Sequence, residues 1–316
     1  MKQGELREVC ERLLSHLSTI IVGKRQTLEM VLTAFLANGH ILFEDFPGLA
    51  KTLTSKLFAQ ALGCKFSRIQ FTPDLLPADI TGTYILDRRD GQFTLRQGPI
   101  FTNILLADEI NRAPPKTQSA LLEAMQERQV TLEGDTYRLE RPFIVVATQN
   151  PIEYEGTYPL PEAQIDRFMM RLSIGYPNKQ EEIEILSRRI ASHTDDYRVE
   201  PTMTPEVFLD AQRVVEEVHF DDTIKDYAVE IVQKTRTHLL VGLGASPRGS
   251  LAILHLARAK AALAGRDYVI PEDVKSVAVP ALSHRLLLKS GTWLAGTKAE
   301  EIIRGILDET KAPRAN

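Results

Sequence analysis

Apolar residues in the first part of the chain follow two alternating patterns. Largely apolar runs, which are typical of strands buried on both faces, cover residues 40–44, 103–107 and 143–147, and residues 65–71 look like a further strand. Apolar residues spaced three or four positions apart, which indicate amphipathic helices, cover residues 3–18, 26–37, 52–62 and 116–128. Strands that alternate with helices in this way predict an α/β fold whose parallel sheet is covered by helices on both faces.

Two pairs of shorter segments interrupt this alternation. Each pair flanks a turn that contains glycine, which is the usual signal of a β-hairpin. The first pair is 83–86 and 92–95 around Asp87-Arg88-Arg89-Asp90-Gly91, and the second is 130–132 and 137–139 around Gly134-Asp135. We therefore expect two hairpins inserted into the α/β domain.

The strand pattern disappears from about Asn178 onward. Helical spacing then covers residues 179–193, 205–218, 222–240, 247–264, 271–284 and 297–310. The change of pattern at Gly175-Tyr176-Pro177-Asn178 predicts a boundary between an α/β core, residues 1–177, and an all-helical domain, residues 178–316. No internal repeat, low-complexity tract or long run of charge indicates a further division.

The composition is that of a globular protein without a strong electrostatic preference. Of the 316 residues, 43% are hydrophobic and 25% are charged, so a sizeable core is expected and disorder is not. The formal net charge of −4 gives no overall attraction to nucleic acid or to an anionic membrane, and the aromatic residues are not interleaved with a basic patch. The composition therefore argues against a nucleic-acid partner.

The sequence also predicts a cytoplasmic location. Only two cysteines occur, Cys10 and Cys64, so a reducing compartment and no disulfide framework are expected. The first residues are rich in glutamate, unlike a signal peptide, and the longest apolar stretch, residues 30–43, is interrupted by Asn38-Gly39-His40. We expect no membrane span. The histidines show no spacing typical of zinc ligands, so a zinc site is not expected either.

The apolar run at residues 40–44 leads into a turn and a helix with the layout of a phosphate-binding loop. Pro47 and Gly48 supply the turn, and Lys51-Thr52 stands at the head of the following helix. In such loops, backbone N–H groups and the helix N-terminus face an anion, the lysine reaches the outer phosphates and the hydroxyl holds Mg²⁺. The layout predicts nucleotide binding. The alternative is a strand, turn and helix of an unrelated α/β protein.

The loop departs from its consensus at two positions. The consensus is Gly, four residues and then Gly-Lys-Thr, whereas Asp45 stands at the first glycine and Ala50 at the second. Ala50 is a mild change if its backbone is helical, because glycine is needed only where φ is positive or a side chain would clash. Asp45 tolerates a tight turn but adds like-charge repulsion near a triphosphate unless its carboxylate points away. The sequence leaves both orientations of Asp45 open.

Polar residues after two later strands could complete a site for ATP hydrolysis. Asp108-Glu109 follows the run 103–107, where the first acid could hold Mg²⁺ through water and the second could orient and deprotonate a water molecule. Asn150 follows the run 143–147, and its amide could bridge that water and the γ-phosphate. Each feature has an ordinary alternative, because acid pairs occur in exposed turns and Asn before Pro often opens a turn.

Arg167 and Arg248 are the candidate cations for stabilising a phosphoryl-transfer transition state. Ser246 as N-cap and Pro247 at the first helical position would place Arg248 in the first turn of a helix. A cation there opposes the helix dipole, so another constraint is expected to select it. The alternative for either residue is an ordinary surface arginine.

Taken together, these motifs resemble those of the MoxR family of AAA+ ATPases, in family order from residue 20 to about residue 290. The strings that carry the resemblance are Ile21-Val22-Gly23-Lys24, Phe46-Pro47-Gly48-Leu49-Ala50-Lys51-Thr52, Ala107-Asp108-Glu109-Ile110-Asn111-Arg112-Ala113-Pro114-Pro115-Lys116, Ala147-Thr148-Gln149-Asn150-Pro151, Leu160-Pro161-Glu162-Ala163-Gln164-Ile165-Asp166-Arg167-Phe168 and Gly244-Ala245-Ser246-Pro247-Arg248. The resemblance covers most of the chain, and the strings together are far more specific than any one of them.

The resemblance implies an αβα ATPase core and a C-terminal helical lid, with ATP and Mg²⁺ between them. The residues that it places around the nucleotide are Ile21, Val22, Pro47, Gly48, Leu49, Ala50, Lys51, Thr52, Leu53 and Asp108. Of these, Ile21 and Val22 would pack near adenine, and Thr52 and Asp108 would hold the metal, mainly through water.

The resemblance also implies roles for the remaining polar residues. Glu109 would be the water-activating base, Asn150 the sensor 1 residue and Arg248 the sensor 2 residue. Arg167 would be an arginine finger that acts on the nucleotide of the neighbouring subunit. The hairpin at 83–96 would be the helix-2 insert of this clade and the hairpin at 129–140 the one before sensor 1, both facing the centre of the ring or its client.

Such proteins are similar to chaperone-like motors that work with partners carrying a von Willebrand factor A domain, and for this chain we expect assembly into a ring, with a hexamer as the expected form. The leading interpretation is therefore a Mg²⁺-dependent ATPase that remodels a partner protein, with a client that the chain does not name. Two alternatives stay open. One is a metal-insertion motor resembling the ATPase subunit of magnesium chelatase, and the other is a nucleotide-gated scaffold in which Asp45 has weakened binding or turnover.

Overall fold

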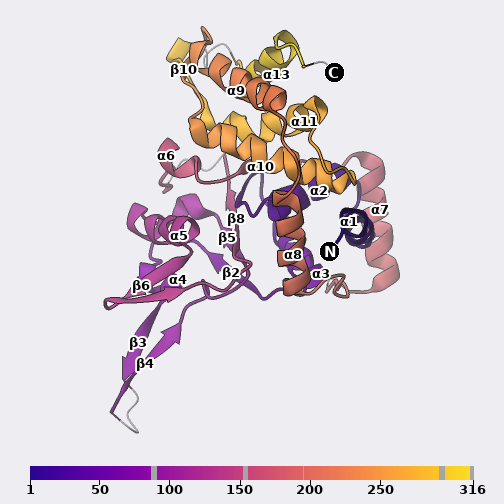
Figure 1. The fold of residues 1–316 in the computed structure, drawn as a ribbon. Coiled ribbons are helices and arrows are strands. Elements are labelled where there is room, and N and C mark those ends of the chain that lie inside the picture. Colours follow the sequence, from indigo (N-terminus) through magenta and orange to yellow (C-terminus); the bar gives the residue numbers. More distant parts are fainter. Residues whose placement is uncertain (87–90, 152–155, 195, 292–295, 314–316) are drawn as a thin grey trace.

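A five-stranded parallel sheet, in the order β2-β5-β8-β1-β9, forms the centre of the computed structural model (Figure 1). The structure describes residues 1–86, 91–151, 156–194, 196–291 and 296–313. The strands are β1 (Ile41–Glu44), β2 (Phe66–Gln70), β5 (Ile104–Asp108), β8 (Ile144–Gln149) and β9 (Met170–Leu172). The parallel sheet confirms the predicted α/β class. The apolar pattern does not predict β9, because this strand is only three residues long and has Arg171 at its centre.

Side chains alternate between two buried clusters along the central strands. Ile41, Phe43 and their equivalents on β5 and β8 pack against α1 (Gln3–Ser18), α2 (Arg25–Leu36) and α3 (Lys51–Ala61). Leu42 and its equivalents pack against α4 (Pro77–Thr81) and α5 (Pro115–Glu127) on the other face. Because both faces are covered, the strands read as continuous apolar runs rather than as alternating ones.

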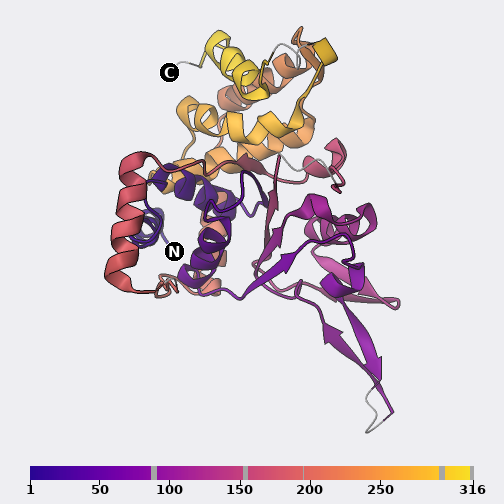
Figure 2. The same ribbon diagram turned by 180° about the vertical axis from the view of Figure 1, so that it is seen from behind.

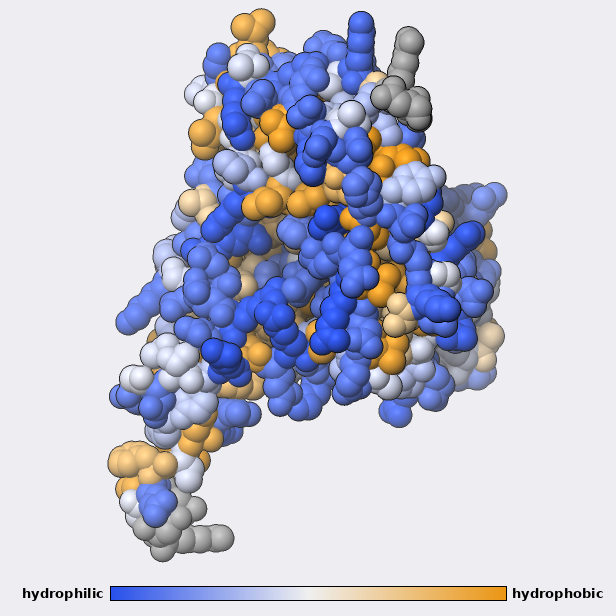
Figure 3. Space-filling view, in the orientation of Figure 1, coloured by the Kyte–Doolittle hydropathy of each residue, from blue (hydrophilic) through white to orange (hydrophobic). Residues whose placement is uncertain are grey.

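Both predicted hairpins are present. β3 (Gly82–Leu86) pairs antiparallel with β4 (Phe93–Gln97), and β6 (Gln129–Leu132) pairs antiparallel with β7 (Asp135–Arg138). Residues 87–90 of the first predicted turn lie outside the described residues. Figures 1 and 2 show the β3–β4 hairpin extending away from the rest of the molecule, and apolar side chains gather near its end in Figure 3.

The C-terminal half is largely helical, as its periodicity predicts. Its helices in the described part of the chain are α6 (Glu162–Ile165), α7 (Lys179–Ser192), α8 (Pro205–Glu216), α9 (Asp222–Thr237), α10 (Pro247–Leu263), α11 (Pro271–Leu282), the 3₁₀ turn η2 (Ser283–Arg285) and α13 (Ala299–Glu309). Helix α10 packs against α1 and α2 as well as against α9 and α11. The helices α9, α11 and α13 lie at the end of the molecule opposite the β3–β4 hairpin (Figures 1 and 2).

The expectation that strands are absent after residue 178 is wrong. β10 (Val241–Leu243) pairs antiparallel with β11 (Leu287–Leu288), and α9 ends at Thr237 rather than continuing to residue 240. Both strands are too short to produce a period-two pattern, so their apolar residues read as extensions of the neighbouring helices. Among the described residues, no helix has both the length and the apolar character that crossing a membrane requires.

Candidate functional site

The loop between β1 and α3 has the strained backbone of a phosphate-binding loop. Gly48 has a φ of 81°, and Ala50, which caps α3, has a φ of 54°. The helical backbone considered for Ala50 is therefore wrong, because this residue adopts the left-handed conformation in which glycine is preferred. That conformation costs an L-residue about 1–2 kcal/mol. A side chain at Gly48 would meet no atom within 4 Å, so this part of the loop borders open space.

The carboxylate of Asp45 points away from that open space. Its Oδ1 accepts a hydrogen bond from Ser173 Oγ (3.0 Å), and its Oδ2 accepts from the backbone N–H groups of Ile174 and of Gly175 (3.3 Å). These donors follow β9, on the chain segment that leads to α7. Asp45 is buried and fully engaged in this structure, so the orientation that would repel a triphosphate is not the one observed.

Lys51 lies at the start of α3 and reaches back across the loop. Its Nζ donates to the carbonyl oxygens of Asp45 (2.9 Å) and Phe46 (3.1 Å). Burial lowers the pKa of Lys51 below its usual range, although the negative charges of Asp45, Asp108 and Glu109 act in the opposite direction. Three acids near one lysine give an excess of negative charge, which a bound cation would offset.

The acid pair occupies the end of β5, with Thr148 of β8 holding its backbone. Thr148 Oγ1 donates to Asp108 Oδ1 (2.6 Å) and accepts from the Glu109 N–H (2.8 Å). Glu109 has a φ of 56°, a strained conformation that aims its side chain across the ends of the strands. Strain of this kind is commonly retained at functional sites, and here the Thr148 hydroxyl stabilises it.

Two residues of β2 contact the acids. Arg68 donates to Asp108 Oδ2 from Nε (3.2 Å) and from Nη2 (2.7 Å), and Gln70 Nε2 donates to Glu109 Oε2 (2.7 Å). Arg112 Nε also lies 3.2 Å from Glu109 Oε2. Both acids therefore have partners with which a bound metal or water molecule would compete.

Two neighbouring cavities collect the residues predicted to surround the nucleotide. A polar cavity of about 380 Å³ is lined by Pro47, Gly48, Leu49, Ala50, Lys51, Thr52, Leu53, Arg68, Gln70, Asp108, Glu109, Thr148 and Asn150. A more apolar cavity of about 170 Å³ shares Gly48, Leu49, Ala50 and Leu53 with it, and is also lined by Ile20, Ile21, Val22, Lys24, Ile174, Gly175, Pro177, Ile185, Arg188 and Tyr197. The polar cavity has the donors and acids for a phosphate chain with its metal, and the apolar cavity has the surface for a base.

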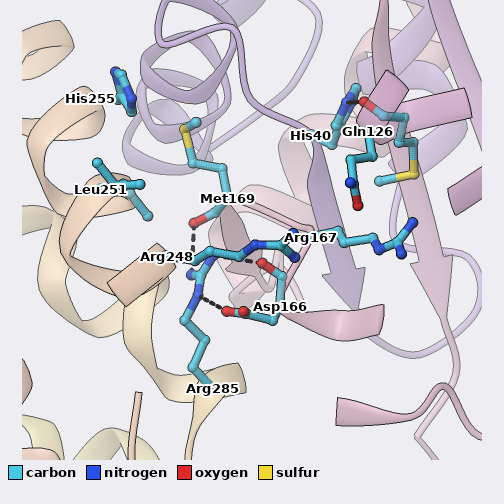
Figure 4. A pocket seen from close by; sticks show the side chains of 11 residues that line it. His40, Gln126, Asp166, Arg167, Met169, Arg248, Leu251, His255 and Arg285 are labelled. Carbon is cyan, nitrogen blue, oxygen red and sulfur yellow. Dashed lines mark hydrogen bonds and ion pairs between the residues drawn. The ribbon is translucent and has the colours of Figure 1, made fainter. Parts of the chain in front are cut away.

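The two candidate arginines lie elsewhere, in a separate cavity of about 250 Å³ (Figure 4). Arg167 follows α6 and donates from Nη1 to the Leu122 carbonyl (2.6 Å), while Arg248 lies in the first turn of α10. Ser246 caps this helix and Pro247 occupies its first position, as predicted. The structure therefore brings Arg248 to Arg167 and not to Lys51, so a placement of Arg248 over the phosphates of its own chain is not observed.

Sequence comparisons give the same assignment as these motifs. The family described as "ATPase family associated with various cellular activities (AAA)" matches residues 40–170, and the AAA lid domain matches residues 233–306. The chain is 50% identical to the uncharacterized protein YeaC of Bacillus subtilis over 98% of this chain and 97% of YeaC. It is 44% identical to Chaperone MoxR1 of Mycobacterium tuberculosis over 97% of this chain and 83% of MoxR1. The chain belongs to the MoxR family of AAA+ ATPases.

A solved structure supports the same conclusion for the fold. A crystal structure of a protein from Cytophaga hutchinsonii, assigned as an ATPase, matches with a TM-score of 0.92 and 39% identity, covering 99% of this chain and 97% of that one. The predicted αβα core and helical C-terminal region of a MoxR-family ATPase are thus confirmed, and so is its class as an enzyme that hydrolyses ATP.

Sequence reasoning missed several residues of this MoxR-family site. Arg68 and Gln70 alternate with the buried Ile69 on β2, so a period-two pattern could have placed both on one face of the strand. Arg285 had no such signal. Its side chain is 3% exposed, and it donates to Asp166 Oδ1 (2.7 Å) and to the Phe168 carbonyl (2.8 Å) on the segment that carries Arg167.

Asp166 joins the two arginine-bearing segments. Its Oδ2 accepts from Ser246 Oγ (3.0 Å), the hydroxyl that caps α10, while its Oδ1 accepts from Arg285. One carboxylate thus fixes the start of the helix that carries Arg248 beside the loop that carries Arg167 (Figure 4). A cation in the first turn of a helix is unfavourable, so we expected another constraint to select Arg248. The contact between Asp166 and the cap of α10 is such a constraint.

Proposed function

We propose that this MoxR-family ATPase is a Mg²⁺-dependent motor that assembles into a ring, with six subunits as the expected number, and remodels or matures a partner protein. The observation that carries the proposal is the gathering of Lys51, Asp108 and Asn150 in one cavity. The name of MoxR1, a chaperone, supports a remodelling role, because that protein and this chain share 44% of their residues over almost the whole of this chain. We further propose that residues 1–177 act as the ATPase core and residues 178–316 as the lid.

In this proposal, the phosphate chain of ATP lies in the polar cavity and adenine in the apolar one. The backbone N–H groups of the loop and Lys51 hold the phosphates, and Ile21 and Val22 pack against the base. The hydroxyl of Thr52 and the carboxylate of Asp108 are hard oxygen ligands that suit Mg²⁺ directly or through water. The metal, when bound, neutralises charge on the phosphate oxygens.

Glu109 serves as the base for hydrolysis. It takes a proton from a water molecule whose oxygen attacks the γ-phosphorus, while the bond from that phosphorus to the leaving ADP oxygen breaks. Asn150 lines the same cavity and orients the water. Gln70 and Arg112 both contact Oε2 of Glu109, so they compete with the water molecule for this carboxylate and also hold it in place.

The two arginines act on the nucleotide of the neighbouring subunit. In the parallel sheet, Asp108 is the last residue of β5 and Asn150 follows the end of β8, whereas Arg167 precedes the start of β9. His40, at the start of β1, lines the arginine cavity, and the phosphate loop follows the end of the same strand. A four-residue strand spans about 13 Å. Arginines at the opposite edge of the sheet suit a site completed by a second copy.

A partner could engage the projecting hairpin. Phe93 is 69% exposed and Leu86 is 52% exposed, on the hairpin that extends away from the rest of the molecule (Figure 1). Exposed apolar side chains gathered on one projection are typical of a binding surface. We propose that this hairpin contacts the client, and that a protein with a von Willebrand factor A domain is the working partner. The identity of the client stays open.

The experiment is phosphate release from the purified protein with Mg²⁺-ATP, over a series of protein concentrations. Turnover per chain is expected to rise with protein concentration, because each site needs a neighbour. Lys51→Ala should lose both binding and turnover, while Glu109→Gln should keep ATP binding and lose turnover by about 100-fold or more. Retained turnover in Glu109→Gln would contradict the role of this base. ATP binding without turnover in the unaltered protein would instead favour a nucleotide-gated scaffold.

A further inference from the structure

Asp45 makes contacts that a phosphate loop does not need for holding phosphate. Its side chain is buried, 5% exposed, and it accepts hydrogen bonds from one hydroxyl and two backbone N–H groups of residues 173–175. A carboxylate so placed is well stabilised, because charge-assisted hydrogen bonds are stronger than neutral ones. The loop is therefore joined to a second segment by a side chain at the position of a consensus glycine.

That second segment forms a wall of the apolar cavity. Ile174, Gly175 and Pro177 line the cavity proposed for adenine. Phe46, which follows Asp45 in the phosphate loop, adds another contact to this segment. Its ring stacks on that of Tyr176, with ring centroids 5.6 Å apart and an angle of 27° between the rings. Lys24 Nζ holds the same segment by donating to the Tyr176 carbonyl (2.9 Å). The segment 173–177 is thus fixed on one side to the phosphate loop.

We propose that Asp45 is a positioning residue that ties the phosphate loop to the adenine wall and thereby increases affinity for ATP. The proposal rests on the ATP site described above. Asp45 touches neither phosphate nor base, and it acts by holding residues 173–175 at a fixed distance from the loop. The spacing between the two cavities is then set before ATP arrives, which reduces the ordering that binding would otherwise require.

The proposal predicts the opposite change in ATP affinity from the one expected if Asp45 repelled the phosphates. If the carboxylate repelled phosphate, then Asp45→Gly, which restores the consensus, would tighten ATP binding. If it ties the loop to the wall, the same change leaves two buried N–H groups without an acceptor and adds backbone freedom to the loop, so binding weakens. Asp45→Asn separates repulsion from linkage further. Asparagine removes the negative charge but keeps one side-chain oxygen that can accept a hydrogen bond from residues 173–175.

The test measures the KM for ATP and the kcat for Asp45→Gly, Asp45→Asn and Ser173→Ala, with Ser187→Ala on the surface of α7 as the control. We expect KM to rise about tenfold in Asp45→Gly, by less in Asp45→Asn, and about twofold to threefold in Ser173→Ala. The kcat at saturating ATP should stay within about threefold, because Asp45 does not touch the reacting atoms. A variant that is only less well folded would lose kcat and melt earlier without a selective change in KM.

The double variant Asp45→Gly/Ser173→Ala tests the link itself. Since Ser173 donates to Asp45, the double variant should have the KM of Asp45→Gly alone. A lower KM in either Asp45 variant, or effects of Asp45→Gly and Ser173→Ala that multiply, would overturn the inference. Failure of the unaltered protein to bind ATP, measured by calorimetry, would instead overturn the proposed function.

Discussion

Arg68 is the residue whose contacts must change before Asp108 can serve a metal. Its guanidinium donates twice to Asp108 Oδ2, and its side chain is 48% exposed, so it can swing into solvent. A metal or its bound water competes with this cation for the same oxygen. We expect Arg68→Met to lower the Mg²⁺ concentration that gives half-maximal turnover by about threefold to tenfold, since a charge-assisted bond of modest strength is removed.

The matched control for this prediction is Lys65→Met, which removes a cation near the start of the same strand. Lys65 pairs with Glu140 at 3.2 Å, and both side chains are more than two-thirds exposed. Its removal should leave the Mg²⁺ requirement unchanged. A higher Mg²⁺ requirement in Arg68→Met would mean that Arg68 assists the nucleotide rather than competing with the metal.

His40 makes the stability of the core depend on pH. Its Nδ1 accepts from the Val145 N–H (2.9 Å), and its Nε2 faces the Met125 carbonyl (3.1 Å) in a buried site. Burial, with a smaller contribution from the positive charge of Arg128, lowers the pKa of His40 from 6.5 to about 4. Between these values the unfolded chain binds more protons than the folded one, so stability falls as the pH falls.

The expected size of this effect from His40 is about 2 kcal/mol of unfolding free energy lost between pH 7 and pH 5. The buried His284, whose pKa is also well below its usual range, adds to the same slope. Urea unfolding at the two pH values measures the loss. In His40→Gln the difference between pH 7 and pH 5 should shrink, and an unchanged difference would exclude His40 as a cause.

At the scale of elements, length decided what could be predicted. Strands such as β5 and β8, and helices such as α1 and α10, repeat their apolar pattern over enough residues to identify both type and position. β9, β10 and β11 have two or three residues each, too few for any period. The site shows the same limit, because the phosphate loop and acid pair are local strings, whereas the contact of Arg285 with Asp166 joins residues 119 positions apart.

The segment that carries Arg167 depends on the lid through Arg285. This arginine contacts Asp166, Phe168 and Met169, and its removal would leave a partly buried carboxylate without its cation. Breaking such a pair from one side costs about 3 kcal/mol or more. We expect Arg285→Met to lose about that much unfolding free energy, measured by urea denaturation, and to lose turnover under conditions in which the variant is still folded.

An exposed arginine provides the comparison for Arg285. Arg213 pairs with Asp210 at 2.8 Å, and its side chain is 76% exposed. Arg213→Met should change stability by no more than about 0.5 kcal/mol and leave turnover unaltered. If Arg285→Met were as mild as this control, the bonds from Arg285 would not be what holds the Arg167 segment in place.

At the scale of the whole molecule, the residues proposed to bind the nucleotide lie at the C-terminal ends of the parallel strands, and the two arginines lie near the N-terminal ends. A chain built in this way cannot bring both to one nucleotide without a large rearrangement, but a ring of identical subunits joined head to tail can do so at every interface. Mixing two inactive variants tests this arrangement. One variant is Lys51→Ala, which lacks a working nucleotide site, and the other is Arg167→Ala/Arg248→Ala, which lacks both cations.

If the arginines act between subunits, an equimolar mixture should recover about one quarter of the unaltered activity. Half of the subunits keep a working site and half of their neighbours keep the arginines, so about one interface in four is complete. If the arginines acted within their own chain, every chain in the mixture would still carry a defect and no activity would return.

Mixing Lys51→Ala with Glu109→Gln is the control, because Lys51 and Glu109 line the same cavity and no neighbour can supply either. Recovery in the first mixture but not in the second would assign the arginines to the adjacent subunit, and equal recovery in both would refute that assignment.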